Sequence, residues 1–344
     1  MELAQGVKVD DRLQALTDWL AADGFISAAK QLISMPGDAS FRRYFRLNQG
    51  SQSYVVMDAP PARENCRPFV AIAKTLRELG IETPVVFSSD LEQGFLRLTD
   101  FGDETYLKAL QRHNADTLYR RALNALAVMQ RCRAVSNYTL PLFNAEFMLQ
   151  EWQWHKEWFL HKFLGLDDDA RWSALDKCFE LLIHSAATQP QVFMHRDYHS
   201  ANLMVLPDSV GVLDFQDAFI GPVTYDAVSL LRDCYIAWPI EQVQQWAVSY
   251  LGILQSQGDL VNVSKDVFLQ WFDWMGIERH LKALFTFSRK FLRDQQPAYL
   301  QHIPRTLNYV IKISEKYAEL DALHHYMANI VQPACDKALA KCAR

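Results

Sequence analysis

The feature of the sequence that most constrains its fold is a polar loop followed by a short hairpin, within residues 192–214. An apolar run leads into the loop, which contains Asp197 and, five positions later, Asn202. Two short apolar segments then flank a turn at 207–209, and Asp214 follows the second segment. Short apolar segments joined by a Pro/Asp/Ser turn predict two antiparallel strands. The hairpin should therefore carry polar groups at its open end.

The geometry of this hairpin predicts a metal site. If the turn is centred on Asp208, Asn202 lies opposite Asp214, and directly opposed Cβ atoms in a hairpin are roughly 4.5–5.5 Å apart. An amide oxygen and a carboxylate at that separation can share one Mg²⁺, which takes oxygen ligands and keeps other positions for water or phosphate. Asp197 lies just before the hairpin, so it can reach the same cleft without being a ligand. We expect it to orient a substrate hydroxyl or accept its proton.

The spacing H-x-D-x-x-x-x-N, with an Asp after a short hairpin, is the catalytic-loop pattern of protein kinases. Together with the segments at 214–217 and 221–226, it resembles the aminoglycoside phosphotransferase branch of the kinase-like fold. More narrowly, the segments at 37–45 and 57–61 are similar to bacterial anomeric kinases of N-acetylmuramate and N-acetylglucosamine, which serve cell-wall sugar recycling. The expected activity is therefore ATP-dependent transfer of a phosphoryl group to the hydroxyl of a small sugar.

The organisation of the chain agrees with an α+β, bilobal protein-kinase-like fold. The first hundred residues predict a helix, two strands, a second helix and two further strands, which suits a small antiparallel sheet with packed helices. From Tyr106 onward, long helical patterns dominate, over 117–132, 144–164, 171–187 and most of 224–340. We expect a nucleotide-binding lobe at 1–101 and a catalytic and substrate-binding lobe at 102–344.

The resemblance implies roles for individual residues. It implies that Asp197 is the catalytic base or the residue that orients the hydroxyl, and that Asn202 and Asp214 hold Mg²⁺. It implies that Asp226 braces the catalytic loop through backbone N–H groups, and we expect His195 to support the same loop as a buried imidazole. The predicted nucleotide contacts are Gly37 and Ser40 at the phosphates, and Thr99, Asp100 and Phe101 in the hinge that meets the adenine.

Two departures from the kinase pattern concern the phosphate-binding groups. The Gly-rich loop is reduced to Gly37, and the strand that usually carries a phosphate-binding Lys has none over 54–58. Guanidinium groups bind phosphate well. Our hypothesis is that Arg42 or Arg43 supplies the missing positive charge, although neighbouring residues of a strand point to opposite faces, so one of them should face solvent.

Four further residues are candidates for contact with the acceptor. His199 follows the catalytic Asp in the loop, and an exposed loop His with no contact to substrate is an equal alternative. Trp158 belongs to an aromatic stretch at helical spacing, which is more typical of core packing than of sugar stacking. The other two candidates are Arg232 and Asp233.

Composition excludes several other classes of protein. The 344 residues are 50% hydrophobic and carry a formal net charge of −5, with no basic run that would suit nucleic acid. No apolar run reaches the roughly 18 residues of a membrane span. Charged residues interrupt the N-terminal segment, which is unlike a signal peptide, and the six cysteines form no C-x-x-C pair. We expect reduced thiols and a cytoplasmic location.

The sequence leaves the acceptor, the choice between ATP and GTP, and the oligomeric state open. The nearest alternative is a kinase of another small alcohol, such as an aminoglycoside, choline or homoserine. A second alternative is a metal-dependent phosphohydrolase that uses His195, Asp197, His199 and Asp214. A third, a kinase-shaped protein without activity, is disfavoured by the intact set of Asp197, Asn202 and Asp214.

Overall fold

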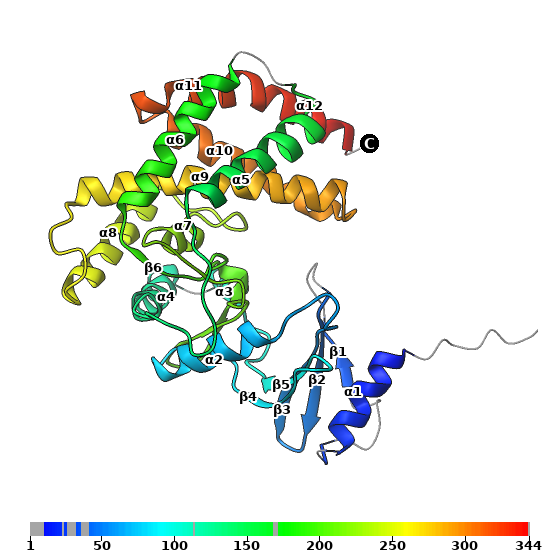
Figure 1. Cartoon of the computed structure of the whole chain (residues 1–344). Coiled ribbons are helices and arrows are strands. Elements are labelled where there is room, and N and C mark those ends of the chain that lie inside the picture. Colours follow the sequence, from blue (N-terminus) through cyan, green and yellow to red (C-terminus); the bar gives the residue numbers. More distant parts are fainter. Residues whose placement is uncertain are drawn as a thin grey trace, which may run out of the picture.

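A computed structural model describes residues 10–22, 24–25, 32–35, 41–112, 114–167 and 171–342. Within these ranges the fold is α+β, as predicted, with an antiparallel sheet near the N-terminus and a mostly helical remainder (Figure 1). The predicted phosphate contacts Gly37 and Ser40 lie outside the described residues. The predicted division after residue 101 falls between the last strand of the sheet, which ends at Thr99, and the first helix of the larger lobe, which begins at Tyr106. We keep that boundary as a proposal.

The N-terminal sheet has five strands in the order β1-β2-β3-β5-β4, each antiparallel to its neighbour. They are β1 (Leu32–Ser34), β2 (Arg43–Gln49), β3 (Gln52–Asp58), β4 (Val86–Asp90) and β5 (Phe95–Thr99). The predicted hairpin forms β2 and β3, with Gly50 in the turn at φ 60°. Strand β1 was not predicted, because residue 32 was assigned to the end of a helical pattern.

A helix packs on each face of this sheet. Val56 joins the cluster that receives the apolar side of α1 (Asp11–Ala22), whereas the next residue, Met57, joins the core that receives α2 (Arg67–Glu78). This alternation is what a pleated strand imposes on successive side chains. The central strand β3 therefore contributes side chains to a hydrophobic cluster on each face of the sheet.

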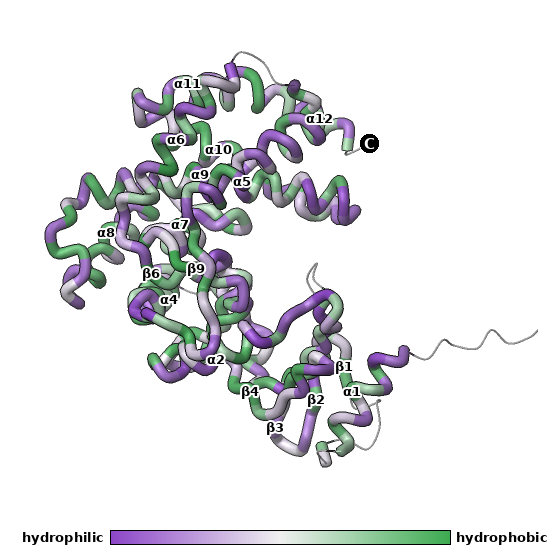
Figure 2. Tube along the Cα trace, viewed as in Figure 1, coloured by the Kyte–Doolittle hydropathy of each residue, from purple (hydrophilic) through white to green (hydrophobic). Residues whose placement is uncertain are grey.

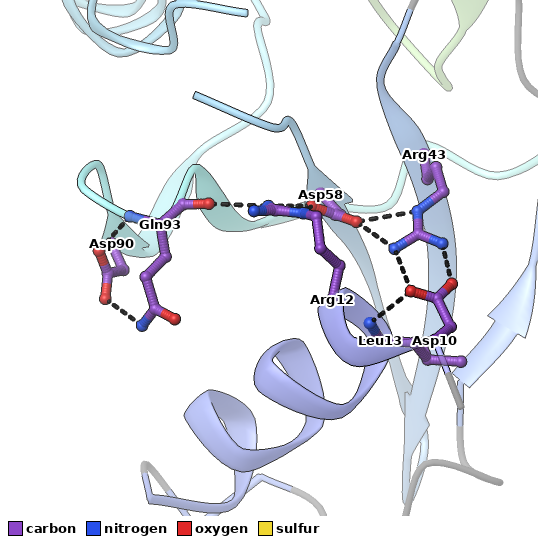
Figure 3. A network of polar contacts seen from close by, with 7 residues as sticks. All are labelled: Asp10, Arg12, Leu13, Arg43, Asp58, Asp90 and Gln93. Atoms are coloured by element: carbon purple, nitrogen blue, oxygen red, sulfur yellow. Dashed lines mark hydrogen bonds and ion pairs between the residues drawn. The ribbon is translucent and has the colours of Figure 1, made fainter. Parts of the chain in front are cut away.

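An ion-pair network ties α1 to the sheet at the end of β3 (Figure 3). Asp58 is fully buried and accepts hydrogen bonds from the guanidinium groups of Arg12 on α1 and Arg43 on β2. Arg43 is also paired with Asp10, just before α1. A buried carboxylate is tolerated when it is paired and hydrogen-bonded, so these arginines make the docking of α1 specific.

The larger lobe is built around one long helix, α9 (Lys265–Leu292), which is buried along much of its length. Hydrophobic and hydrophilic segments alternate along the helices of this lobe, as expected of amphipathic helices (Figure 2). The other helices are α3 (Tyr106–Ala109), α4 (Ala115–Met129), α5 (Ala145–Trp154), α6 (Trp172–Thr188), α7 (Tyr225–Leu231), α8 (Ile240–Ser256), α10 (Ile303–Ser314), α11 (Asp321–Tyr326) and α12 (Gln332–Cys342). Helix α9 packs against five of these helices, α5, α6, α7, α8 and α10.

The predicted helical stretches agree with α4, with α5 and its π-helical continuation η2 (His155–Phe163), and with α6. Two small two-stranded sheets interrupt the helices: β6 (Gln191–Met194) with β9 (Phe219–Pro222), and β7 (Leu203–Val205) with β8 (Val210–Val212). Strand β9 was not predicted. Among the described residues, no helix is both long and apolar enough to cross a bilayer.

Candidate active site

The predicted catalytic loop, residues 195–202, follows β6, ends in a 3₁₀ turn, η3 (Ser200–Asn202), and leads into the β7–β8 hairpin. β6 is held by four residue pairs with β9, from Gln191↔Pro222 to Met194↔Phe219. The loop is therefore anchored to strands at both of its ends.

Asp226, in the first turn of α7, is fully buried beneath the loop. Its carboxylate accepts the backbone N–H of His195 at 2.7 Å and that of Arg196 at 3.0 Å. Burial raises the pKa of Asp226 to about 7, although both hydrogen bonds favour the charged form. Arg196 has φ 75°, a conformation that L-residues adopt only when surrounding contacts impose it. These are the contacts that the predicted bracing role requires.

His195 links the loop to the hairpin. Its Nε2 lies 2.9 Å from the carbonyl oxygen of Leu213, and its Nδ1 lies 3.3 Å from the backbone nitrogen of Asp197. Burial lowers the pKa of His195 to about 4, so the ring is neutral at physiological pH. The contacts fix the tautomer: Nε2–H donates to the carbonyl, and Nδ1 accepts the backbone N–H.

The register of the β7–β8 hairpin differs from the prediction by one residue. The last pair is Val205 with Val210, which leaves a loop of four residues instead of a turn centred on one. Asn202 consequently faces Leu213, whose N–H donates to the Asn202 carbonyl at 2.9 Å, and not Asp214. The predicted register was wrong, because turn residues alone do not determine how many of them form the loop.

Asn202 and Asp214 are nevertheless neighbours. Asp214 has φ 63°, in the left-handed region, so the chain after β8 does not continue in the extended conformation of the strand. The Nδ2 of Asn202 lies 3.4 Å from Oδ2 of Asp214 and 3.0 Å from the carbonyl oxygen of Asp197. The structure therefore brings the three predicted residues together by a backbone bend at Asp214.

Asp197 has a partner that the sequence did not reveal. The ammonium of Lys282, on α9, lies 3.2 Å from Oδ1 of Asp197. Burial disfavours the charged carboxylate, but the positive charge of Lys282 and other nearby groups outweighs burial, and the pKa of Asp197 lies well below its ordinary value. For Asp214 the balance is reversed: burial raises its pKa, and the charge of Asp197 adds to this effect.

The two arginines of β2 and its N-terminal edge point to different places. Arg42 pairs with Glu64 at 2.9 Å and lies 3.8 Å from Oδ1 of Asp214. Arg43 belongs instead to the Asp58 network (Figure 3). Alternation along an extended segment accounts for this split. Of the two, Arg42 is placed beside the predicted metal ligand.

The predicted hinge, residues 99–101, packs against the hairpin. The carboxylate of Asp100 is held by Arg46 at 2.6 Å. A Cβ added to Gly211 on β8 would lie only 2.9 Å from a ring carbon of Phe101, so a glycine is needed for this close approach. Through Phe101, the segment therefore packs against the β7–β8 hairpin.

A cavity of about 680 Å³ lies between these elements. Its lining includes Arg42, Asp197, His199, Asn202 and Asp214. This volume is in the range of small-molecule sites, roughly 300–1,000 Å³.

Several other predicted contacts, all among the described residues, do not line this cavity. The hinge residues 99–101 are absent from the described lining, as are Trp158, Arg232 and Asp233. Lys162 lies over the ring of Trp158, with 3.8 Å from its ammonium to the ring centroid. Arg232 is buried in an ion pair with Asp273. The carboxylate of Asp233 accepts the N–H of Ser200 at 2.9 Å, so it holds the start of η3.

Comparison with known proteins agrees with this geometry. Residues 32–259 match the family model described as the phosphotransferase enzyme family. A Pseudomonas putida protein named N-acetylmuramate/N-acetylglucosamine kinase is 40% identical over 93% of this chain and 97% of its own length. A Neisseria meningitidis protein of the same name is 37% identical over 86% of this chain and 89% of its own.

Solved structures of low identity share the fold. ADP-bound aminoglycoside phosphotransferase APH(2'')-Ib superposes with a TM-score of 0.56 at 14% identity, over 87% of this chain and 98% of that one. The choline kinase LicA from Streptococcus pneumoniae gives 0.60 at 11% identity, over 87% and 98%. On the family match and the near full-length relatives, the chain belongs to the phosphotransferase enzyme family.

Proposed function

We propose that this chain is an ATP-dependent sugar kinase. It transfers the γ-phosphoryl group to the anomeric hydroxyl of N-acetylmuramate or N-acetylglucosamine, in the cytoplasmic recycling of cell-wall sugars. The observation that carries the proposal is the cluster of Asp197, Asn202 and Asp214 on one cavity of suitable size. Two relatives that match most of the chain bear the names of these sugars, which supports the choice of acceptor.

The cluster fits a magnesium ion. Asn202 and Asp214 offer an amide oxygen and a carboxylate, which are the ligand types that Mg²⁺ prefers. Burial and the nearby charge of Asp197 raise the pKa of Asp214, so the ionised carboxylate is disfavoured there. A bound divalent cation would stabilise this ionised form. When bound, Mg²⁺ neutralises the charge of the phosphates during phosphoryl transfer.

Asp197 acts on the acceptor hydroxyl. Its lowered pKa keeps it ionised at neutral pH, so it can accept a hydrogen bond from the hydroxyl and direct the oxygen toward the γ-phosphorus. A carboxylate with so low a pKa is a weak base. Orientation of the hydroxyl should therefore contribute more than early removal of its proton, which passes to the carboxylate as the new O–P bond forms.

The contacts of His195 weigh against the phosphohydrolase alternative. That mechanism needs His195 as a metal ligand, yet both of its ring nitrogens are engaged, with a carbonyl oxygen and with a backbone N–H. The helix α9 weighs against choline and aminoglycosides, because it brings the cations Arg279, Lys282 and Lys290 to the cavity. A cationic acceptor would be repelled there.

The acceptor panel is the direct test of the proposal. Purified full-length chain is assayed for ADP release with Mg²⁺ and ATP, and separately with GTP. The acceptors are N-acetylmuramate, N-acetylglucosamine, choline, homoserine and an aminoglycoside. We expect turnover with the two amino sugars. Turnover with choline or the aminoglycoside alone would reject the sugars and keep the kinase, whereas release of phosphate from a sugar phosphate in the absence of nucleotide would indicate a hydrolase.

Replacing Arg42 by Ala should raise KM for ATP by roughly tenfold, since one charge-assisted contact is worth about that factor. The reason is its position beside Asp214, where its guanidinium can meet the phosphates. Arg43→Ala is the matched control. It should lower the melting temperature by removing a partner of buried Asp58, with little effect on KM for ATP. An unchanged KM in Arg42→Ala would rule out this role.

A further inference from the structure

One side of the cavity is formed by a single stripe of α9. The stripe consists of Arg279, Lys282, Ala283, Thr286, Phe287 and Lys290, all of which line the cavity. Their spacing of three and four residues places them on one side of the helix. The short helix η4 (Pro297–His302) continues this surface with Ala298, Tyr299, Gln301 and His302. We call these ten residues the α9–η4 wall.

Acidic and basic side chains lie on different sides of the cavity. The carboxylates in its described lining are Glu64, Asp197, Asp214 and Asp217. They come from the segment before α2, the catalytic loop and the residues after β8. The α9–η4 wall contributes three cations and, within the described lining, no carboxylate. The wall therefore favours an anionic group on the acceptor, at a distance from the metal ligands.

The wall also offers aromatic surface for a sugar ring. The rings of Phe287 and Tyr299 are stacked with centroids 5.7 Å apart, and His302 lies 5.7 Å from Phe287 and 4.8 Å from Tyr235. Tyr235 lines the cavity beside them. Aromatic faces combined with a few charged groups are typical of small-molecule sites.

The three cations of the wall differ in their contacts. Arg279 is buried and donates to Ser229 Oγ. Lys282 is paired with Asp197, at the end of the wall where the reacting hydroxyl belongs. Lys290 is eight residues further along α9, about 12 Å along the helix axis. Its ammonium lies 5.9 Å from the ring centroid of Tyr299.

We propose that Lys290 binds the carboxylate of acceptors that carry one, and so determines selectivity between an acidic and a neutral amino sugar. This inference rests on the proposed function. N-acetylmuramate carries a lactyl carboxylate at C3, away from the anomeric carbon, and N-acetylglucosamine has a hydroxyl there. With the anomeric hydroxyl at Asp197, the lactyl group extends along the wall. The ammonium of Lys290 lies beside the ring of Tyr299 on the same wall, at the end away from Asp197.

The test compares three acceptors in Lys290→Met, which keeps most of the length of the side chain and removes its charge. The acceptors are N-acetylmuramate, its methyl ester and N-acetylglucosamine. We expect kcat/KM for N-acetylmuramate to fall roughly 10- to 100-fold, the value of a charge-assisted contact, and the other two to fall far less. Lys290→Arg should restore most of the selectivity. In the unmodified enzyme, raising the salt concentration should lower kcat/KM for N-acetylmuramate more than kcat/KM for the other two acceptors.

Arg293→Gln is the matched control, since Arg293 follows α9, is paired with Asp294 and does not line the cavity. It should leave the ratio of the kcat/KM values for the two sugars unchanged, which excludes a long-range effect of net charge. Equal losses for all three acceptors in Lys290→Met, or no loss for N-acetylmuramate, would overturn the role of Lys290 alone. Failure of the unmodified enzyme with both sugars would instead overturn the proposed function, and this inference with it.

Discussion

Replacing Asp197 by Asn is expected to lower kcat by roughly three orders of magnitude, within the range that loss of a general base produces. The amide has nearly the same shape, but it lacks the negative charge that holds and directs the acceptor hydroxyl, and it cannot take the proton as the new O–P bond forms. It also loses the charge that pairs with Lys282, so the ammonium would no longer be held at 3.2 Å from this side chain. Steady-state ADP release with the preferred sugar measures the effect.

Nucleotide binding should survive the same substitution. Asp197 is proposed to touch the acceptor, and the metal is proposed to lie on Asn202 and Asp214. The increase in melting temperature caused by Mg²⁺ and ATP should therefore remain close to that of the unmodified chain. Asp208→Asn, in the exposed loop of the same hairpin, is the matched control and should keep full activity. A kcat within tenfold of normal in Asp197→Asn would contradict the assignment.

Replacing Asp214 by Asn should have the second largest effect, a loss of roughly 100- to 1,000-fold in kcat/KM, comparable to loss of a strong electrostatic group at a transition state. An amide is a weaker ligand for Mg²⁺ than a carboxylate. Asn is also the suitable substitution, because it tolerates the left-handed backbone that Asp214 adopts at φ 63°. The fold around the hairpin should therefore persist.

Two measurements separate a metal role of Asp214 from a structural one. The concentration of Mg²⁺ that gives half-maximal activity should increase, and the thermal stabilisation by Mg²⁺ and ATP together should shrink relative to that by ATP alone. Without ligands, the melting temperature should change little, because 45% of the Asp214 side chain is exposed and an Asn amide oxygen can keep the hydrogen bond from Gln216. An unchanged Mg²⁺ requirement would remove Asp214 from the metal site.

Local patterns were sufficient to predict the loop, the hairpins and most of the helices. The period of hydrophobic residues and the turn residues alone predict β2, β3, α4, α5 and α6. The register of the β7–β8 hairpin did not follow from them. A shift of one residue changes which side chains face each other, and it depends on the packing around the hairpin more than on its turn sequence.

Long-range contacts were the other part that the sequence did not reveal. Lys282 meets Asp197 from 85 positions away, and in the sequence it is one basic residue among several on a long amphipathic helix. Only the spacing of Arg279, Lys282 and Lys290 on one stripe of α9 hints at a common surface. The sequence likewise did not reveal which of Arg42 and Arg43 faces the cavity. Asp58 pairs with Arg43 and holds it away from the cavity.

The docking of α1 has a consequence for synthesis on the ribosome. Leu16 and Leu20 of α1 are buried against Phe95, which belongs to the last strand of the sheet to be made. Roughly eighty residues separate these partners, so at ordinary translation rates the apolar side of the nascent helix waits about 4–16 s for its binding surface. During that time the emerging chain is a natural client for a chaperone.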